Sequence, residues 1–368
     1  MKRAFTACLV LLFFAISTAR GADVQPLAIG SPAPDFDLPG VDGPNHKLHD
    51  FDAARVLVVI FTCNHCPTAQ AYEGRIKQMY ADYKNKGVAL VAINPNNPDA
   101  IRLDELGYTD LSDSFDEMKI RAREHGFEFP YLYDGDTQKV AHAYGVLATP
   151  HVFIFDQNRK LRYEGRIDDS DVHQIHHTDA RNAIDALLAG RLVPVQTTRV
   201  FGCSTKWIDK TDSARRAEEK WNEQPVNISA IDAAHVKQLA ANDTKNLRLI
   251  NVWATWCGPC VAELPELIKL PQMYHARGFE LITISADNPD KEDRALALLK
   301  DKHVAVTNYI FNSDDHDALA DALDKQWQGP LPHTILVAPG GKVIYRHTGE
   351  LNMLELKQAI VGYLGRTY

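Results

Sequence analysis

The chain has 368 residues, of which 45% are hydrophobic and 24% are charged, and its formal net charge is −8. This length allows two domains that each bury a core, and the composition is that of a globular protein, not of a disordered one. The acidic balance argues against nucleic acid as a partner, because binding nucleic acid requires a basic surface.

The first 22 residues have the pattern of an export signal. Lys2 and Arg3 form a basic start, an apolar run of thirteen residues follows over 4–16, and small residues come next. That run is short for a membrane span of roughly 20 residues, so we expect membrane attachment only if the segment stays uncleaved. We predict a signal peptide over residues 1–22 and a location in the periplasm or cell envelope.

Two pairs of cysteines each follow an apolar run. Cys63 and Cys66 come after RVLVVIF, and Cys257 and Cys260 come after LRLINVWA. Runs rich in branched apolar residues predict strands buried on both faces, and the periodicity that follows each pair predicts a helix. We therefore expect each pair to lie at the end of a strand, where a helix begins.

The repetition continues downstream of each pair. In both halves a further predicted strand and helix precede a proline, Pro150 or Pro332, and a predicted hairpin and C-terminal helix follow it. Strands that alternate with helices predict α/β domains with mainly parallel sheets. We expect a first domain over residues 26–208, a linker over 209–228 and a second domain over 229–368.

This layout resembles the thioredoxin fold, present twice in tandem. The first half is similar to redoxin, or AhpC/TSA-related, proteins in GSPAPDFDLPGVDG, FTCNHCP, GFEFPYLYD, GRIDDS and GCSTKW. The second half is similar to TlpA-like and ResA-like reductases in WATWCGPC, AELPEL and PHTILV. The resemblance implies an α/β fold of two thioredoxin-like domains, each a mixed, mainly parallel sheet flanked by helices, and it implies no cofactor.

The spacing of the pairs favours thiol exchange over a structural role. A bridge across two residues closes a loop too small to stabilise much, and a zinc site wants four ligands close together. The resemblance implies the redox disulfides Cys63–Cys66 and Cys257–Cys260. The helix start would favour a thiolate on the first cysteine, and the second would resolve the mixed disulfide. Expected partners are protein thiols and disulfides and an upstream membrane or periplasmic electron donor.

Other residues are expected to face or tune these pairs. As a cation, His65 in CNHC would stabilise a thiolate and raise the reduction potential of the first pair. By resemblance, Pro150 and Pro332 would face the cysteines through cis bonds and turn Thr149 and Leu331 toward a substrate peptide.

The second site also contains a candidate base. Glu263, three residues after Cys260, matches the acid of the ResA-like family; the alternative is a solvated acid at a helix start. CGPC contains no residue like His65, so a more oxidising first site would take electrons from the second. This difference predicts an internal relay from CGPC to CNHC.

Peroxide reduction by the first half is an alternative that its resemblance to redoxins raises. Peroxiredoxins surround their cysteine with PxxxTxxC. With Cys66 as that cysteine the threonine position would contain Cys63, and with Cys63 it would contain Ile60. Neither choice fits, so thiol exchange is the preferred interpretation.

Two further alternatives concern residues outside the pairs. His173, His176 and His177, together with CNHC, would suit a copper chaperone, although a polar loop with chance histidines is the simpler interpretation. Cys203 is either a third exchange thiol or a buried cysteine without chemistry, and the sequence favours burial.

Overall fold

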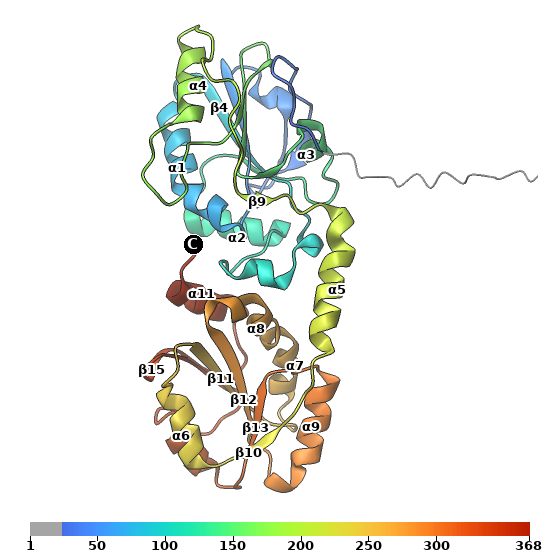
Figure 1. The fold of residues 1–368 in the computed structure, drawn as a ribbon, viewed down its shortest axis with the longest axis vertical. Coiled ribbons are helices and arrows are strands. Elements are labelled where there is room, and N and C mark those ends of the chain that lie inside the picture. The colour runs from blue at the N-terminus through green and yellow to red at the C-terminus, as the bar shows by residue number, and fades with distance from the viewer. Residues whose placement is uncertain (1–23) are drawn as a thin grey trace, which may run out of the picture.

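The computed structural model describes residues 24–368, so the predicted signal peptide lies outside the described residues. Two main sheets lie one beyond the other along the long axis of the molecule, and helix α5 (Thr211–Asn222) runs along one side between them (Figure 1). None of the residues of α5 is buried, and the helix lies within the segment over 209–228 that the sequence predicts to be a linker. Within residues 24–368, no helix combines the length and the apolar character that crossing a membrane needs.

The first sheet has the strand order β5-β4-β3-β7-β8, and its central strand is fully buried. Strands β3, β4 and β5 are parallel, whereas β7 and β8 form an antiparallel hairpin beside β3. Two pairings of each kind make this sheet mixed, not mainly parallel. The strands are β3 (Val56–Phe61), β4 (Val88–Asn94), β5 (Tyr131–Tyr133), β7 (His151–Phe155) and β8 (Leu161–Gly165).

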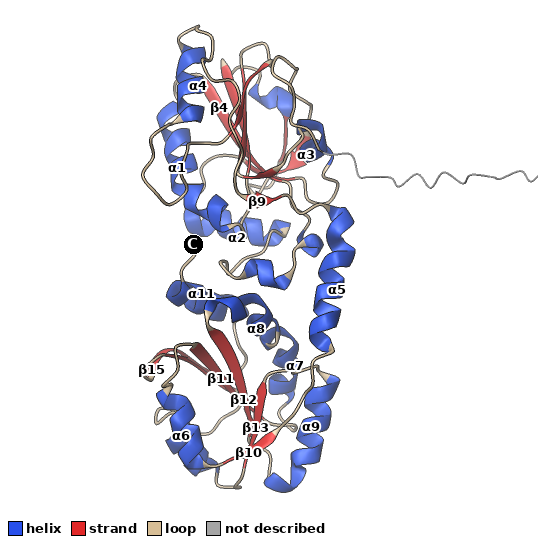
Figure 2. Ribbon diagram, viewed as in Figure 1, coloured by secondary structure: helices blue, strands red, loops and turns tan. Residues whose placement is uncertain are grey.

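Helices cover both faces of this sheet (Figure 2). Residues of α1, α2 and α4 fill the core on one face, and α3 and the N-terminal segment fill the core on the other. The helices are α1 (Pro67–Tyr83), α2 (Phe115–His125), α3 (Lys139–Tyr144) and α4 (Asp179–Leu188). Two small ladders lie outside the main sheet: β1 (Asp37–Pro39) with β2 (Asn45–Lys47), and β6 (Ala148–Thr149) with β9 (Cys203–Ser204).

The second sheet has the order β10-β13-β12-β11-β14-β15, with parallel pairing as far as β11 and antiparallel pairing beyond it. Its strands are β10 (Ser229–Ile231), β11 (Leu247–Trp253), β12 (Phe279–Ser285), β13 (Thr307–Phe311), β14 (His333–Ala338) and β15 (Lys342–Thr348). Its helices are α6 (Ala233–Ala241), α7 (Gly258–Leu267), α8 (Lys269–Tyr274), α9 (Glu292–Asp301), α10 (His316–Leu323) and α11 (Met353–Leu364).

Short 3₁₀ turns connect these elements. Gly278 ends one of them with φ of +70°, a conformation that glycine adopts without steric cost. The turns are η1 (Leu48–Phe51), η2 (Pro98–Ala100), η3 (Leu103–Leu106), η4 (Ile208–Lys210), η5 (His275–Arg277) and η6 (Pro289–Lys291).

The two domains share a hydrophobic cluster. Ile101 and Leu106 of the first domain pack among residues of the second that include Leu247 and Phe279. Leu247 and Phe279 are the first residues of β11 and β12. The end of the second sheet at which β11 and β12 begin therefore faces the first domain.

The C-terminal tail reinforces this contact. Arg366 pairs with Asp110, with one nitrogen–oxygen distance of 2.9 Å, and the rings of Tyr368 and Tyr108 lie 5.0 Å apart. Asp110 is almost fully buried. The last residues of the second domain thus lie against the loop that precedes α2 of the first.

Candidate redox sites

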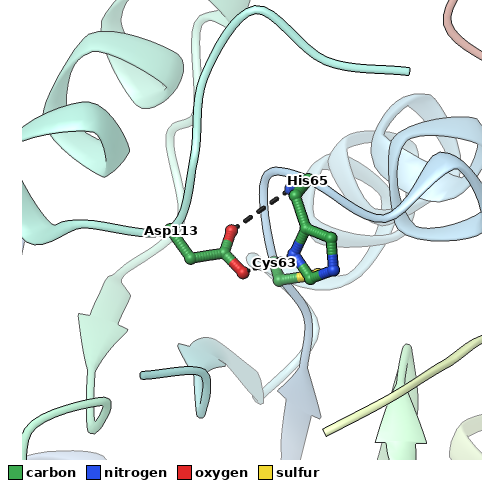
Figure 3. Close-up of side chains that lie close together, drawn as sticks. All are labelled: Cys63, His65 and Asp113. Atoms are coloured by element: carbon green, nitrogen blue, oxygen red, sulfur yellow. Dashed lines mark hydrogen bonds and ion pairs between the residues drawn. The ribbon is translucent and has the colours of Figure 1, made fainter. Parts of the chain in front are cut away.

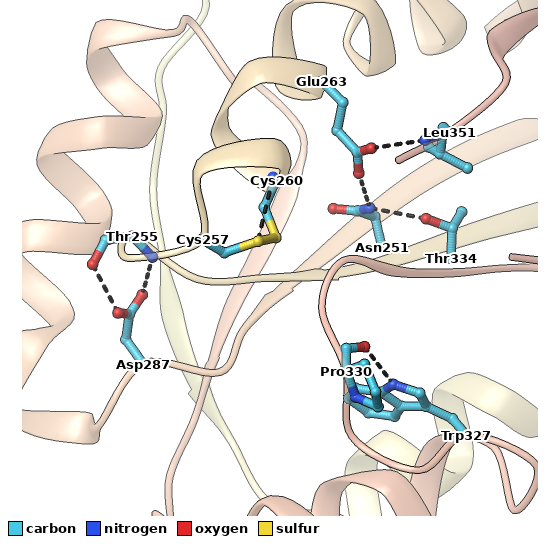
Figure 4. Close-up of a disulfide and its surroundings, with 10 residues drawn as sticks. All are labelled: Asn251, Thr255, Cys257, Cys260, Glu263, Asp287, Trp327, Pro330, Thr334 and Leu351. Carbon is cyan, nitrogen blue, oxygen red and sulfur yellow. Dashed lines mark hydrogen bonds between the residues drawn. A yellow bond between two sulfur atoms is a disulfide. The ribbon is translucent and has the colours of Figure 1, made fainter. Parts of the chain in front are cut away.

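In the second domain, the helix begins directly after the first cysteine of the pair. Cys257 is the residue that caps α7, and the backbone N–H of Cys260 points to its sulfur at 3.3 Å. The two cysteines form a disulfide (Figure 4). Cys257 is 7% exposed, whereas Cys260 is completely buried. Cys257 therefore lies at a helix N-terminus, the position at which the sequence predicts a thiolate.

Glu263 lies one helical turn after Cys260 and is mostly buried. Burial raises its pKa to about 7, even though two hydrogen bonds oppose that shift. The donors are the side-chain amide of Asn251, at 2.9 Å, and the backbone N–H of Leu351, at 3.4 Å (Figure 4). The second site therefore contains a carboxyl group that exchanges its proton near neutral pH.

Replacing Glu263 by glutamine tests whether this carboxyl group controls the exchange. In the natural chain we expect the rate of disulfide reduction to rise with pH through about 7, because only the ionised group accepts a proton, and we expect Glu263→Gln to lack this rise. Stopped-flow reduction of a small disulfide from pH 5.5 to 8.5 measures it. The exposed Glu266 of the same helix gives a matched control, Glu266→Gln.

Stability gives the same substitution a second readout. A carboxyl group whose pKa is higher in the folded chain than in the unfolded chain stabilises the fold most at pH values below its unfolded pKa. This stabilisation is lost as pH rises through its folded pKa. The natural chain should therefore lose at most about 3 kcal/mol of unfolding free energy between about pH 4.5 and pH 7.5, and Glu263→Gln should not. Equal pH profiles for both chains, in rate and in stability, would show that Glu263 is not the proton acceptor of this site.

In the first domain, the helix begins later than predicted. Helix α1 starts at Pro67, so Cys66 caps it and Cys63 lies one turn outside it. The sulfur of Cys63 lies 3.0 Å from the hydroxyl oxygen of Thr149, and the sulfur of Cys66 lies 3.4 Å from the carbonyl oxygen of the same residue. Cys63 is 3% exposed and Cys66 is fully buried.

The charges around the first pair favour a thiolate on Cys66. Burial alone would raise the pKa of Cys66, but hydrogen bonds from the thiols of Cys203 and Cys63 and the charge of His65 hold it well below its usual value. Burial raises the pKa of Cys63. The geometry of this domain therefore favours a thiolate on Cys66 over the expected thiolate on Cys63, because the helix N-terminus lies at Cys66.

A buried ion pair holds the residues between these cysteines. His65 Nδ1 lies 2.6 Å from an oxygen of Asp113, and both side chains are buried (Figure 3). The Asp113 carboxylate also accepts the backbone N–H of Asn64 at 2.7 Å and the side-chain amide of Asn96 at 2.7 Å. Burial would lower the pKa of His65, but the charge of Asp113 raises it, so the pair with Asp113 favours the protonated form of His65 beside Cys66. The sequence contained no signal for Asp113.

The metal-binding alternative depends on which side chains converge. Within residues 24–368, Cys63, His65 and Asp113 are the group of potential ligands close enough to share an ion, with their ligand atoms within 4.8 Å of one another. His65 and Asp113 are already bonded to each other. His173, His176 and His177 are exposed and do not join this group, so the structure does not assemble the copper site that was the alternative for CNHC and these histidines.

Both predicted prolines follow cis peptide bonds, Thr149–Pro150 and Leu331–Pro332. Leu331 lies just before β14 and belongs to no strand. Thr149, in contrast, is paired in β6 with Cys203 of β9. The backbone that was expected to receive a substrate peptide in the first domain is therefore occupied by the chain itself.

A cysteine pair that follows a central strand, together with a cis-proline, is the arrangement of the thioredoxin fold, and this chain has that arrangement twice. Residues 29–164 match the model of the AhpC/TSA family, and residues 223–360 match the Redoxin model.

Parts of this chain are similar to curated relatives and to a solved structure. The thiol-disulfide oxidoreductase ResA of Bacillus cereus is 29% identical over 136 residues, which are 35% of this chain and 68% of that protein. The ResA of Oceanobacillus iheyensis is 30% identical over 116 residues, 32% of this chain and 54% of that protein. An uncharacterized conserved protein from Geobacillus kaustophilus is 40% identical over 49% of this chain and 92% of its own, with a TM-score of 0.44. The chain is thus a thiol-disulfide oxidoreductase with two redoxin/AhpC-TSA domains in tandem.

Proposed function

We propose that the chain is exported and exchanges disulfides with other proteins through two sites, Cys63–Cys66 and Cys257–Cys260. The observation that carries this proposal is the Cys257–Cys260 disulfide at the start of α7, with a carboxyl group of pKa about 7 one turn further on. Export is supported by the pattern of residues 1–22. Recovery of a chain that begins after this segment from the periplasmic fraction tests it, and a cytoplasmic, full-length chain would contradict it.

The second site performs the exchange in two steps. The Cys257 thiolate attacks a disulfide of the partner, which releases one partner thiolate and leaves the other in a mixed disulfide. Cys260 then loses its proton to Glu263 and attacks the Cys257 sulfur. The partner leaves with two thiols, after its two thiolates take up one proton from Glu263 and one from water, and the domain keeps the Cys257–Cys260 disulfide. Insulin reduction by the full chain tests this activity.

The proposal includes a relay that passes electrons from the second site to the first. The buried His65 cation supports a more oxidising first site, because a cation beside the thiolate stabilises the reduced pair. The position of CGPC relative to the first domain places a condition on this relay. CGPC follows the end of β11, whereas the beginning of β11 faces the first domain. A strand of this length spans roughly 20 Å, so the domains must separate, or two molecules must meet, before the sites exchange electrons.

Replacing His65 by alanine tests the direction of electron flow. We expect the reduction potential of the first site to fall by about 30–60 mV, which corresponds to roughly 1.4–3 kcal/mol, because the reduced pair loses its neighbouring cation. Equilibration with glutathione buffers measures it in a full chain with Cys257→Ser and Cys260→Ser, so that only the first site titrates. His49→Ala, at an exposed histidine, is the control. An unchanged potential, or a first site more reducing than the second, would contradict the relay.

A further inference from the structure

The segment around Cys203 lies against the cis-proline loop of the first site. Cys203 is the direct partner of Thr149 in the antiparallel pair β6–β9. At Gly202 there is no room for a side chain, because a Cβ atom there would come within 2.1 Å of the Thr149 carbonyl oxygen. Gly202 also has a φ of +143°, which favours glycine. The backbone before Cys203 is therefore in direct contact with the peptide that precedes Pro150.

Contacts on the C-terminal side of β9 fix this segment in place. The backbone N–H of Lys206 donates to the side-chain oxygen of Asn96 at 2.9 Å, and the Lys206 carbonyl accepts the N–H of Asn97 at 3.0 Å. The Lys206 ammonium group pairs with Glu105 at 2.7 Å. Cys203 is thus positioned by bonds on β9 and immediately after it, not by simple burial of a small apolar side chain.

The position of Cys203 relative to the other two thiols is the decisive feature. Its side chain packs against Cys63, Cys66 and Ala69. Cys63 and Cys66 are buried, whereas Cys203 is only half-buried. Since an extended partner peptide would pair with Thr149, Cys203 occupies the place that a partner's cysteine would take. It is also the thiol of the three that solvent reaches most readily.

We infer that Cys203 is a third exchange thiol of the first site, which forms a disulfide with Cys66 and carries the disulfide between the buried pair and an outside partner. This inference rests on the proposed exchange function of Cys63 and Cys66. It assigns chemistry to Cys203, for which the sequence favoured burial without a role.

The exchange balances in three steps. The Cys203 sulfur attacks a partner disulfide, and its proton goes to the sulfur that leaves. The Cys66 thiolate then attacks Cys203, which forms Cys66–Cys203 and releases the second partner thiolate. Cys63 finally attacks Cys66, which forms Cys63–Cys66, and its proton goes to Cys203. Two electrons have passed from Cys63 and Cys66 to the partner, and Cys203 is again a thiol.

Disulfide mapping tests the inference in the full chain with Cys257→Ser and Cys260→Ser. The probe is oxidised glutathione, followed by an acid quench, alkylation of free thiols and mass spectrometry of the digest. With Cys63→Ala added, we expect a peptide linked through Cys66–Cys203, and we expect Cys203→Ser to abolish it. Ser204→Ala, the next residue of β9, is the matched control and should keep the link.

The outcomes separate this inference from the function on which it rests. If the Cys63→Ala chain forms only glutathione adducts, while the chain with all three thiols forms Cys63–Cys66, the role of Cys203 is wrong and the proposed function stands. If the chain with all three thiols forms no Cys63–Cys66 bond at any glutathione ratio, the proposed function of this site fails. Cys63→Ser serves as a second variant should Cys63→Ala not fold, and circular dichroism verifies the fold of each.

Discussion

Replacing Cys257 by serine is expected to reduce the disulfide-reductase activity of the second site by at least about 10³-fold, because a hydroxyl group is a far weaker nucleophile than a thiolate. The measurement is insulin reduction by a full chain in which Cys63→Ser and Cys66→Ser silence the first site. The full chain is required because Ile101 and Leu106 of the first domain pack into the core of the second.

Cys260, the second cysteine of this site, provides the matched variant. Cys260→Ser should retain attack by Cys257 and accumulate mixed disulfides, because the resolving thiol is missing. Alkylation of the reduced natural chain at mildly acidic pH should modify Cys257 well before Cys260, in line with exposures of 7% and 0%. Equal labelling of the two thiols, or substantial activity of Cys257→Ser, would refute the assignment of roles.

Replacing Asp113 by asparagine is expected to destabilise the first domain by about 3 kcal/mol near pH 6, because it leaves the buried His65 without its counter-charge. Asparagine has nearly the same shape as aspartate, so the lost unfolding free energy measures the removal of the charge more than a change in packing. Hydrogen exchange of the β3 amides measures the opening of this domain separately from that of the second. Asp116→Asn, at an exposed acid of α2, is the control and should change little.

The pH dependence of this loss follows from the two pKa shifts. Burial opposes ionisation of Asp113, but the charge of His65 and several hydrogen bonds lower its pKa, so its contribution is present above about pH 4 and is lost at lower pH. The pKa of His65 is raised, so its contribution is complete below about pH 6.5 and is lost as pH rises through the folded value. The difference between the two chains should therefore be greatest between about pH 4 and 6.5. A difference independent of pH would show that the ion pair does not cause it.

Most of the fold could be predicted from local patterns. The runs over 55–61 and 247–254 became β3 and β11, because branched apolar residues without alternation suit strands covered on both faces. The predicted hairpins after Pro150 and Pro332 are β7–β8 and β14–β15. In the second domain the helix position after Cys257 was also predicted, because CGPC leads directly into an apolar periodicity.

The first site was harder to predict because its decisive contacts join distant parts of the chain. Asp113 lies 48 residues from His65, and no motif marks it as the partner of that histidine. The pairing of Cys203 with Thr149 depends on a two-residue strand, too short for a periodic signal. Pro67 explains the late start of α1, because proline is favoured in the first turn of a helix and follows directly after Cys66.

The orientation of the second sheet has a consequence for the kinetics of electron transfer. CGPC lies at the end of β11 that is remote from the first domain, and the interdomain contact includes the buried Asp110 and its pair with Arg366. If electrons pass between molecules, the observed first-order rate constant of the transfer should increase in proportion to protein concentration. If the domains separate first, this observed rate constant should be independent of concentration and should rise when Arg366→Ala weakens the contact. A dilution series with a single-turnover readout therefore distinguishes the two paths that the proposed relay could take.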